Sequence, residues 1–221
     1  MSVNKENYSA INHYCQQRAV QLVAVSKTKP VEDILALYEL GQRDFGENYV
    51  QELVEKQAQL PSDIRWHFIG HLQSNKVKYI APFVHLIHGV DSFKLLKEIN
   101  KQAAKNNRVV GCLLQMHIAK EETKFGLDEA ELQEILGSTE FTSLTNVYVQ
   151  GLMGMASFSD DKTLVQTEFN QLQKIFQQHS ATQTANCHFQ TLSMGMSGDY
   201  EMAVDAGSNM VRIGSLLFGA R

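Results

Sequence analysis

Residues 22–41, LVAVSKTKPVEDILALYELG, contain one complete strand–loop–helix unit, and this unit sets the pattern for the rest of the chain. The short, valine-rich run 22–26 predicts a buried strand. Lys27 and a turn at Pro30 follow, and an amphipathic helix over 31–40 is stopped by Gly41. A helix that returns the chain for a further strand favours parallel pairing of the two strands.

The same unit recurs to the end of the sequence. Seven further strands are predicted, at 43–48, 65–70, 83–90, 108–118, 146–155, 187–195 and 210–214, and an extra helix over 7–18 precedes the first strand. Eight alternating strands and helices favour an α/β fold, a (β/α)8 or TIM barrel, as one domain over 1–221. We expect the eighth helix to be missing and the N-terminal helix to cover that gap.

An open, doubly wound sheet is the alternative fold for this pattern. Such a sheet usually carries a glycine-rich phosphate loop after its first strand. Neither a GxGxxG nor a Walker A motif occurs in the sequence, so the barrel is the better prediction.

The composition is that of an ordinary globular chain, with 43% hydrophobic and 20% charged residues and a formal net charge of −4. This balance excludes a disordered protein and lacks the basic excess of a nucleic-acid binder. The first residues are polar, and the apolar runs are too short to span a bilayer. We therefore expect a cytoplasmic protein with neither nucleic acid nor membrane as a partner.

Cysteine and histidine spacing indicates neither disulfides nor a metal. Cys15, Cys112 and Cys187 are odd in number and far apart, which is typical of reduced thiols in or near a core. The eight histidines show no HExxH or HxH arrangement, so no metal site is expected.

Small and hydroxyl-bearing residues follow the last two predicted strands. In a (β/α)8 barrel these loops commonly bind phosphate. The segment 193–198, SMGMSG, leads directly into a helix whose N-terminus would attract an anion. Gly214 and Ser215 offer close backbone approach and a further hydroxyl. Each segment alone could be a helix cap or a turn, but the two together favour a phosphate site.

Lys27 directly follows the first strand. A lysine in such a place is usually an exposed loop residue. At a barrel mouth, however, a lysine is partly desolvated, which frees its amine to attack an aldehyde. Such an amine beside a phosphate site fits pyridoxal 5′-phosphate (PLP), an aldehyde that carries a phosphate.

Arg212 lies two residues before Gly214, so both face the same side of a strand. Arg212 would then reach the PLP ring while Gly214 touches the phosphate. An arginine keeps its proton and leaves the ring nitrogen largely unprotonated, whereas an aspartate would make a strong electron sink. A salt bridge to a helix acid is the structural alternative for Arg212.

Several segments together resemble the YggS/PROSC family, the pyridoxal phosphate homeostasis proteins. They are VAVSKTKP, FGENYVQE, WHFIGHLQSNK, GLMGM and LSMGMSGDYEMAVDAGSNMVRIGSLLFGAR, in the family's order from near Leu22 to Arg221. The resemblance implies the barrel of the N-terminal domain of alanine racemase, which is the fold-type III PLP architecture. It also implies a role in intracellular vitamin B6 and amino-acid homeostasis, with no established catalytic activity.

The resemblance further assigns roles to single residues. The lysine of the SKTKP motif, here Lys27, holds PLP as a Schiff base, and the arginine of VRIG, here Arg212, contacts the ring nitrogen. The Gly-Thr pair that binds phosphate corresponds to Gly214 and Ser215, where serine keeps the hydroxyl. The remaining implied cofactor-site residues are Ser193, Ser197, Asn48 and His67.

Two functions fit these expectations best. The first is a PLP carrier or regulator without turnover, which hands PLP to apo-enzymes. Two-base racemisation needs an acid/base group on each face of the substrate carbon, and alanine racemases supply one as a tyrosine from a second domain. The chain ends seven residues after Gly214, so we expect no such domain and a monomer.

The second function is a racemase-like PLP enzyme that uses Tyr49 or His67 as its second base. A third possibility, of another class, is a Schiff-base aldolase that works without PLP.

Overall fold

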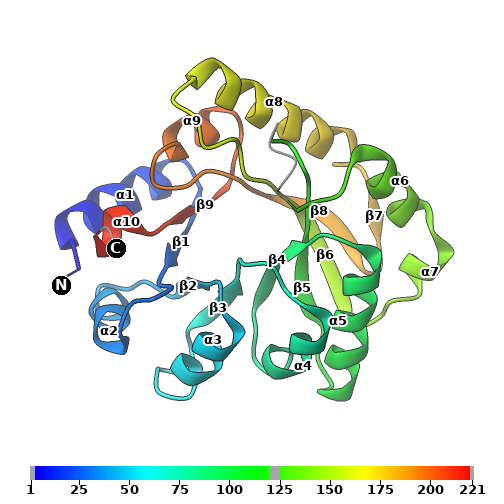
Figure 1. The fold of residues 1–221 in the computed structure, drawn as a ribbon, viewed down its shortest axis with the longest axis horizontal. Helices are drawn as coiled ribbons and strands as arrows, with labels where there is room; N and C mark the ends of the chain where they lie inside the picture. The colour runs from blue at the N-terminus through cyan, green and yellow to red at the C-terminus, as the bar shows by residue number, and fades with distance from the viewer. Residues whose placement is uncertain (1–2, 120–124, 220–221) are drawn as a thin grey trace.

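A computed structural model describes residues 3–119 and 125–219 and contains the expected closed barrel (Figure 1). The eight parallel strands are β1 (Gln21–Val25), β2 (Asp44–Glu47), β3 (Arg65–Phe68), β4 (Leu86–Val90), β5 (Val110–Gln115), β6 (Val147–Met153), β8 (Cys187–Ser193) and β9 (Met210–Ile213). Pairing runs from β6 through β5, β4, β3, β2, β1 and β9 to β8, and β6 also pairs with β8. That last pairing closes the barrel, so the predicted fold class is confirmed.

Helices surround the strands on the outside (Figure 1). They are α2 (Val31–Glu39), α3 (Val50–Gln57), α4 (Val77–Ile80) after a 3₁₀ turn (Ser74–Lys76), α5 (Phe93–Lys105), α6 (Glu129–Gly137), α7 (Thr139–Thr142), α8 (Lys162–Gln178) and α9 (Tyr200–Asp205). Helix α5 shows why the sequence folds this way. Its apolar face, including Leu96 and Ile99, is buried, and the Ser92 hydroxyl caps its first turn by accepting from the Leu95 amide.

The prediction that no helix follows the eighth strand is wrong, because one turn of helix is present there. Helix α10 (Ser215–Phe218) follows β9, and a run of four residues is too short to show helical periodicity in the sequence. Helix α1 (Lys5–Gln17) lies beside α10, as expected for a helix that covers this side of the barrel. The Asn7 side-chain amide donates to the Leu216 carbonyl at 3.0 Å and fixes that contact.

A two-residue strand, β7 (Gln183–Thr184), was also not predicted, and it pairs antiparallel with the start of β8. It lies outside the barrel closure, because β6 pairs directly with β8. No helix within the described ranges is both long and apolar enough to cross a membrane.

The barrel interior is filled by side chains, as is usual for this architecture. Val23, Leu86, Leu113, Met153 and Met210 form an apolar cluster inside it. A larger core lies between the strands and the outer helices, and it includes the three cysteines, which are buried and unbridged. The packed interior leaves the loops at the carboxyl ends of the strands as the place for a site.

Candidate cofactor site

A cavity of about 650 Å³ lies at the carboxyl ends of the strands, and this volume suits a small organic ligand. Its lining comes from segments that follow β1, β2, β3, β6, β8 and β9, which are far apart in the sequence. Six of the eight residues predicted for the cofactor site line this cavity: Lys27, Asn48, Ser197, Arg212, Gly214 and Ser215.

The turn that carries Lys27 is strained and firmly held. Thr28 has a φ of 62°, which is costly for a β-branched residue. The Lys29 amide donates to the Ser26 carbonyl at 3.0 Å, and the Thr28 amide donates to Oε1 of Glu52 at 2.6 Å. These bonds fix the backbone on both sides of Lys27 and direct this residue into the cavity lining.

A buried charged cluster that was not predicted from the sequence supports this turn. The ammonium of Lys56 on α3 donates to the Ser26 carbonyl at 2.7 Å, to Oε1 of Glu47 at 2.8 Å and to Oε1 of Glu52 at 2.6 Å. Burial raises the pKa of Glu47, and the Lys56 charge and the Ser26 hydroxyl oppose that shift. The i,i+4 pair Glu52–Lys56 was the signal available in the sequence.

Arg212 on β9 is 4% exposed, and its guanidinium is held at two points. Nη1 donates to the Ser193 hydroxyl at 2.6 Å, and Nη2 donates to the Gly154 carbonyl at 3.0 Å. Burial lowers the pKa of Arg212 to about 10, and Asp199 opposes that shift, so the side chain stays charged at neutral pH. In the described part of the chain, no carboxylate forms a salt bridge with Arg212. The alternative role for Arg212, a salt bridge to an acidic residue on a helix, is therefore not seen there.

Ser193 and His67 are the two predicted site residues that do not line the cavity. Both are fully buried inside the barrel. Ser193 is the last residue of β8, and its hydroxyl contacts Arg212 and His88 instead of the cavity. The placement gives no support to Ser193 as a phosphate ligand, because its side chain turns inward while the loop that follows runs along the mouth.

The two loops predicted to bind phosphate lie side by side. The Ser197 hydroxyl accepts from the Gly214 amide at 3.2 Å, which ties the loop after β8 to the loop after β9. Gly195 has a φ of +92°, and a Cβ there would lie 2.6 Å from Cβ of Ala203. A Cβ on Gly214 would come within 3.3 Å of both Cβ and the carbonyl oxygen of Val25. Glycine is therefore needed at position 195, where the loop after β8 turns, whereas a Cβ at position 214 would fit only if Val25 shifted by a few tenths of an ångström.

One polar atom in the cavity wall has no hydrogen-bond partner among the described residues. The side-chain oxygen of Asn48 is buried and accepts no hydrogen bond from any described residue. An orphaned buried acceptor is costly, so the site is built to receive a polar ligand. The assignment of oxygen and nitrogen in the amide can be exchanged, and either atom would offer a polar contact.

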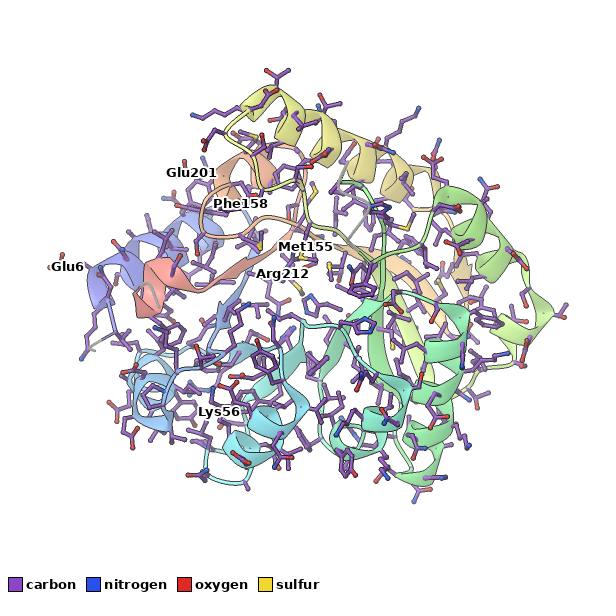
Figure 2. All side chains as sticks on the ribbon, viewed as in Figure 1. Glu6, Lys56, Met155, Phe158, Glu201 and Arg212 are labelled. Atoms are coloured by element: carbon purple, nitrogen blue, oxygen red, sulfur yellow. The ribbon has the colours of Figure 1, made fainter. Side chains whose placement is uncertain are left out.

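The cavity lining also contains apolar side chains. They come from Val25, Ile69, Met155 and Val165, and Phe158 of the same lining is 96% exposed. Figure 2 shows Met155 and Arg212 close together near the middle of the barrel, with Phe158 further out toward α9. A flat ligand with one charged end fits this combination of apolar side chains, cations and glycine-rich loops. In residues 3–119 and 125–219, no cluster of three or more His, Cys, Asp or Glu side chains is arranged to hold a metal ion.

Comparison with known proteins identifies relatives of the whole chain. The family model described as "Alanine racemase, N-terminal domain" matches residues 3–221. A pyridoxal phosphate homeostasis protein of Pasteurella multocida is 39% identical over 219 residues, covering 96% of this chain and 93% of that protein. A protein of the same name from Aquifex aeolicus is 41% identical over 207 residues, covering 93% and 89%.

Solved structures agree with these sequence relatives. PipY of Synechococcus elongatus, solved with PLP bound, superposes with a TM-score of 0.86 at 35% identity and covers 97% of this chain and 99% of its own. Alanine racemase of Bartonella henselae, with covalently bound pyridoxal phosphate, gives a TM-score of 0.73 at 18% identity. It covers 99% of this chain and 60% of its own, and at that identity it supports the fold alone.

Proposed function

Since this chain belongs to the family of pyridoxal phosphate homeostasis proteins and has the fold of the alanine racemase N-terminal domain, we propose that it binds PLP in the cavity at the strand ends. One observation carries the proposal: Lys27, Arg212 and two glycine-containing loops tied by Ser197 meet in a single cavity of suitable size. The related PipY chain, which binds PLP in its solved structure, supports the same assignment.

Lys27 is the residue we propose to hold the cofactor covalently. Its amine condenses with the aldehyde carbon of PLP, so that a C=N bond forms and water leaves. The strained turn at Thr28 keeps the Lys27 backbone in one position, together with the Thr28 amide that donates to Glu52 and the Lys56 ammonium that donates to the Ser26 carbonyl. Bound PLP supplies an electron sink for amino-acid chemistry.

The other cavity residues would bind the remaining parts of the cofactor. Arg212 faces the ring nitrogen as a donor that keeps its proton, which limits the strength of the electron sink. The hydroxyls of Ser197 and Ser215, with the backbone around Gly214, bind the phosphate. Asn48 gives a polar contact through the side-chain atom that has no partner among the described residues.

We further propose that the protein carries or buffers PLP without turning over a substrate. Among the described residues that line the cavity, the titratable side chains are Lys27, Lys29, Asp160, Asp199 and Arg212, with no tyrosine or histidine. Tyr49 is 53% exposed and outside the lining, and His67 is buried between Asp44 and His88. Neither of these two candidates is positioned as a second base opposite Lys27.

Replacing Lys27 tests the proposal directly. Wild-type protein incubated with PLP should become yellow, and borohydride should fix a stable mass addition on the peptide that contains Lys27. Lys27→Ala should give no reducible adduct and should keep only weak, noncovalent binding through the phosphate contacts. Absorbance spectra and peptide mass spectrometry provide the measurement.

Lys29→Ala is the matched control for this experiment. The Lys29 ammonium already donates to the carbonyls of Phe218 and Gly219, at 2.9 and 3.2 Å. This variant should still form the adduct at Lys27. A reducible adduct in Lys27→Ala would assign the covalent bond to another lysine, and colourless wild-type protein would remove the PLP proposal altogether.

The runner-up function is a racemase-like PLP enzyme. Exchange of the α-proton of common amino acids with deuterated solvent would establish it. Transfer of PLP to an apo-enzyme, without such exchange, would establish the carrier. We propose that the protein acts as a monomer in the cytoplasm, which size-exclusion chromatography and cell fractionation test. The three buried, unbridged cysteines are consistent with a reducing compartment.

A further inference from the structure

A chain of hydrogen-bonded side chains runs through the barrel interior, away from the cavity. The Ser193 hydroxyl receives Nη1 of Arg212 at 2.6 Å and lies 3.2 Å from Nδ1 of His88. Nε2 of His88 lies 2.9 Å from Nδ1 of His67, and Nε2 of His67 lies 2.9 Å from Oδ1 of Asp44. Five strands, β9, β8, β4, β3 and β2, each contribute one of these side chains.

The two ends of this row of hydrogen-bonded side chains, Arg212 and Asp44, have fixed hydrogen-bonding roles. Arg212 can only donate a hydrogen bond. At the other end, burial would raise the pKa of Asp44, but hydrogen bonds from His67 and Arg65 outweigh it and hold that pKa well below its usual range. Arg65 donates to both carboxylate oxygens, at 2.8 and 2.6 Å. Asp44 is therefore a carboxylate that only accepts.

These ends determine the position of every proton between them. The His67 Nε2–H donates to Asp44, so Nδ1 of a neutral His67 must accept from the Nε2–H of His88. Nδ1 of His88 then accepts the Ser193 hydroxyl proton, and the Ser193 oxygen accepts from Arg212. All four bonds are satisfied with both rings neutral and in the Nε2–H tautomer.

A charged histidine would break this order. Burial lowers the pKa of His88 well below its usual value, and the nearby charge of Arg212 adds to that effect. If His67 carried two protons, His88 would have to donate to Ser193 through Nδ1. Ser193 would then receive two donors, and its own proton would have no acceptor among its partners in the described chain.

We infer that Asp44, His67, His88 and Ser193 act as positioning residues for Arg212, through a proton-ordered relay in which both histidines are neutral Nε2–H tautomers. The relay gives the buried guanidinium an ordered, polarised acceptor in place of an adjacent carboxylate. It thereby determines which side of the Arg212 guanidinium remains available to a ligand in the cavity. The part of this inference that concerns the cofactor rests on the proposed function, because it needs Arg212 to meet the PLP ring.

The first test needs no cofactor. Protein labelled with ¹⁵N-histidine is examined without PLP by two-dimensional NMR that correlates the ring nitrogens with the carbon-bound protons. We expect His67 and His88 to show Nε2–H tautomers near neutral pH. Their signals are assigned by their loss in His67→Gln and His88→Gln. An Nδ1–H tautomer or a doubly protonated ring at either position would overturn the relay.

The second test breaks the link between the relay and Arg212. Ser193→Ala should shift the His88 Nδ1 signal in PLP-free protein, because that nitrogen loses its donor. It should also weaken PLP binding about tenfold or more, since the lost bond involves a charged group, and should move the absorbance band of bound PLP. Ser193→Thr, which keeps the hydroxyl, should restore the wild-type band.

Ser208→Ala is the matched control. Ser208 is also a buried serine, and its hydroxyl contacts the carbonyls of Leu192 and Met194, but it does not touch Arg212. It should leave the PLP band and affinity unchanged. If the wild-type protein binds PLP and Ser193→Ala leaves its affinity and absorbance band unchanged, as the control does, then Ser193 does not position Arg212, while the proposed function stands. If wild-type protein binds no PLP, the proposed function fails, and the NMR experiment still decides the relay.

Discussion

Lys56 and Glu47 show how single residues support the cofactor site without touching its cavity. Their charged atoms lie 2.8 Å apart, with 7% and 0% of the side chains exposed. The same ammonium also holds the Ser26 carbonyl, one residue before Lys27. A buried pair of this kind contributes little net stability when complete, but removing one partner leaves an uncompensated charge.

Lys56→Met should therefore lower the free energy of unfolding by about 3–5 kcal/mol, measured by urea denaturation. Lys97→Met is the control, because Lys97 forms an exposed pair with Glu140, and it should cost less than about 1 kcal/mol. Adding Glu47→Gln to Lys56→Met should recover part of the loss. Equal effects of the two lysine variants would contradict the buried role.

At the scale of elements, the connection from β8 to α9 depends on its backbone shape. Gly195 takes a left-handed conformation directly after Met194 and places the following segment beside Gly214. Gly198 lies in the same segment, has no left-handed φ, and has open space where a Cβ would be. A side chain would therefore be poorly tolerated at position 195 and well tolerated at position 198, although the sequence shows both as small loop residues.

Gly195→Ala should destabilise the protein by about 1–3 kcal/mol, because it adds backbone strain and a contact of 2.6 Å with Ala203. Gly198→Ala should change the unfolding free energy by no more than about 0.5 kcal/mol. Thermal unfolding of the two variants under the same conditions provides the comparison. A tolerated Gly195→Ala would show that the conformation at this position is not required.

At the scale of the whole molecule, the two ends of the barrel differ: one carries the cavity and the other carries an ion pair. The carboxyl ends of the strands form the cavity, and the first residues of β2 and β3, Asp44 and Arg65, form a partly buried ion pair at the other end. The relay through His67 and His88 connects these two ends. The Asp44–Arg65 ion pair at one end is therefore linked to the orientation of Arg212 at the other.

Acid should weaken the fold through Asp44. Its folded pKa lies below the unfolded value of about 3.9, so its contribution is present above that pH and is lost as the pH falls. The unfolding free energy should decrease from about pH 5 downward, and Asp44→Asn should be less stable at pH 7 and show a shallower slope. Glu39→Gln, which replaces an exposed side chain on α2, should change the unfolding free energy at pH 7 by no more than about 0.5 kcal/mol.

The linear pattern was enough to determine the fold and to predict which strand-end residues line the cavity. Strand and helix periodicities are local properties, so eight strand–helix units could be counted, and the end of each strand placed Lys27, Gly214 and Ser215 at the mouth. The motif containing Arg212 likewise predicted its place in the cavity wall. The four-residue helices α7 and α10 and the two-residue strand β7 were too short to leave a periodic signal.

The direction of side chains inside the barrel was decided by the tertiary structure alone. Ser193 and His67 were predicted beside the cofactor because they lie in or next to site motifs, but both point into the barrel and meet His88 from a third strand. Glu47 and Lys56 likewise meet only because α3 packs back onto β2. Closure of the barrel brings residues from distant strands within hydrogen-bond distance, and no local pattern in the sequence encodes which of them will touch.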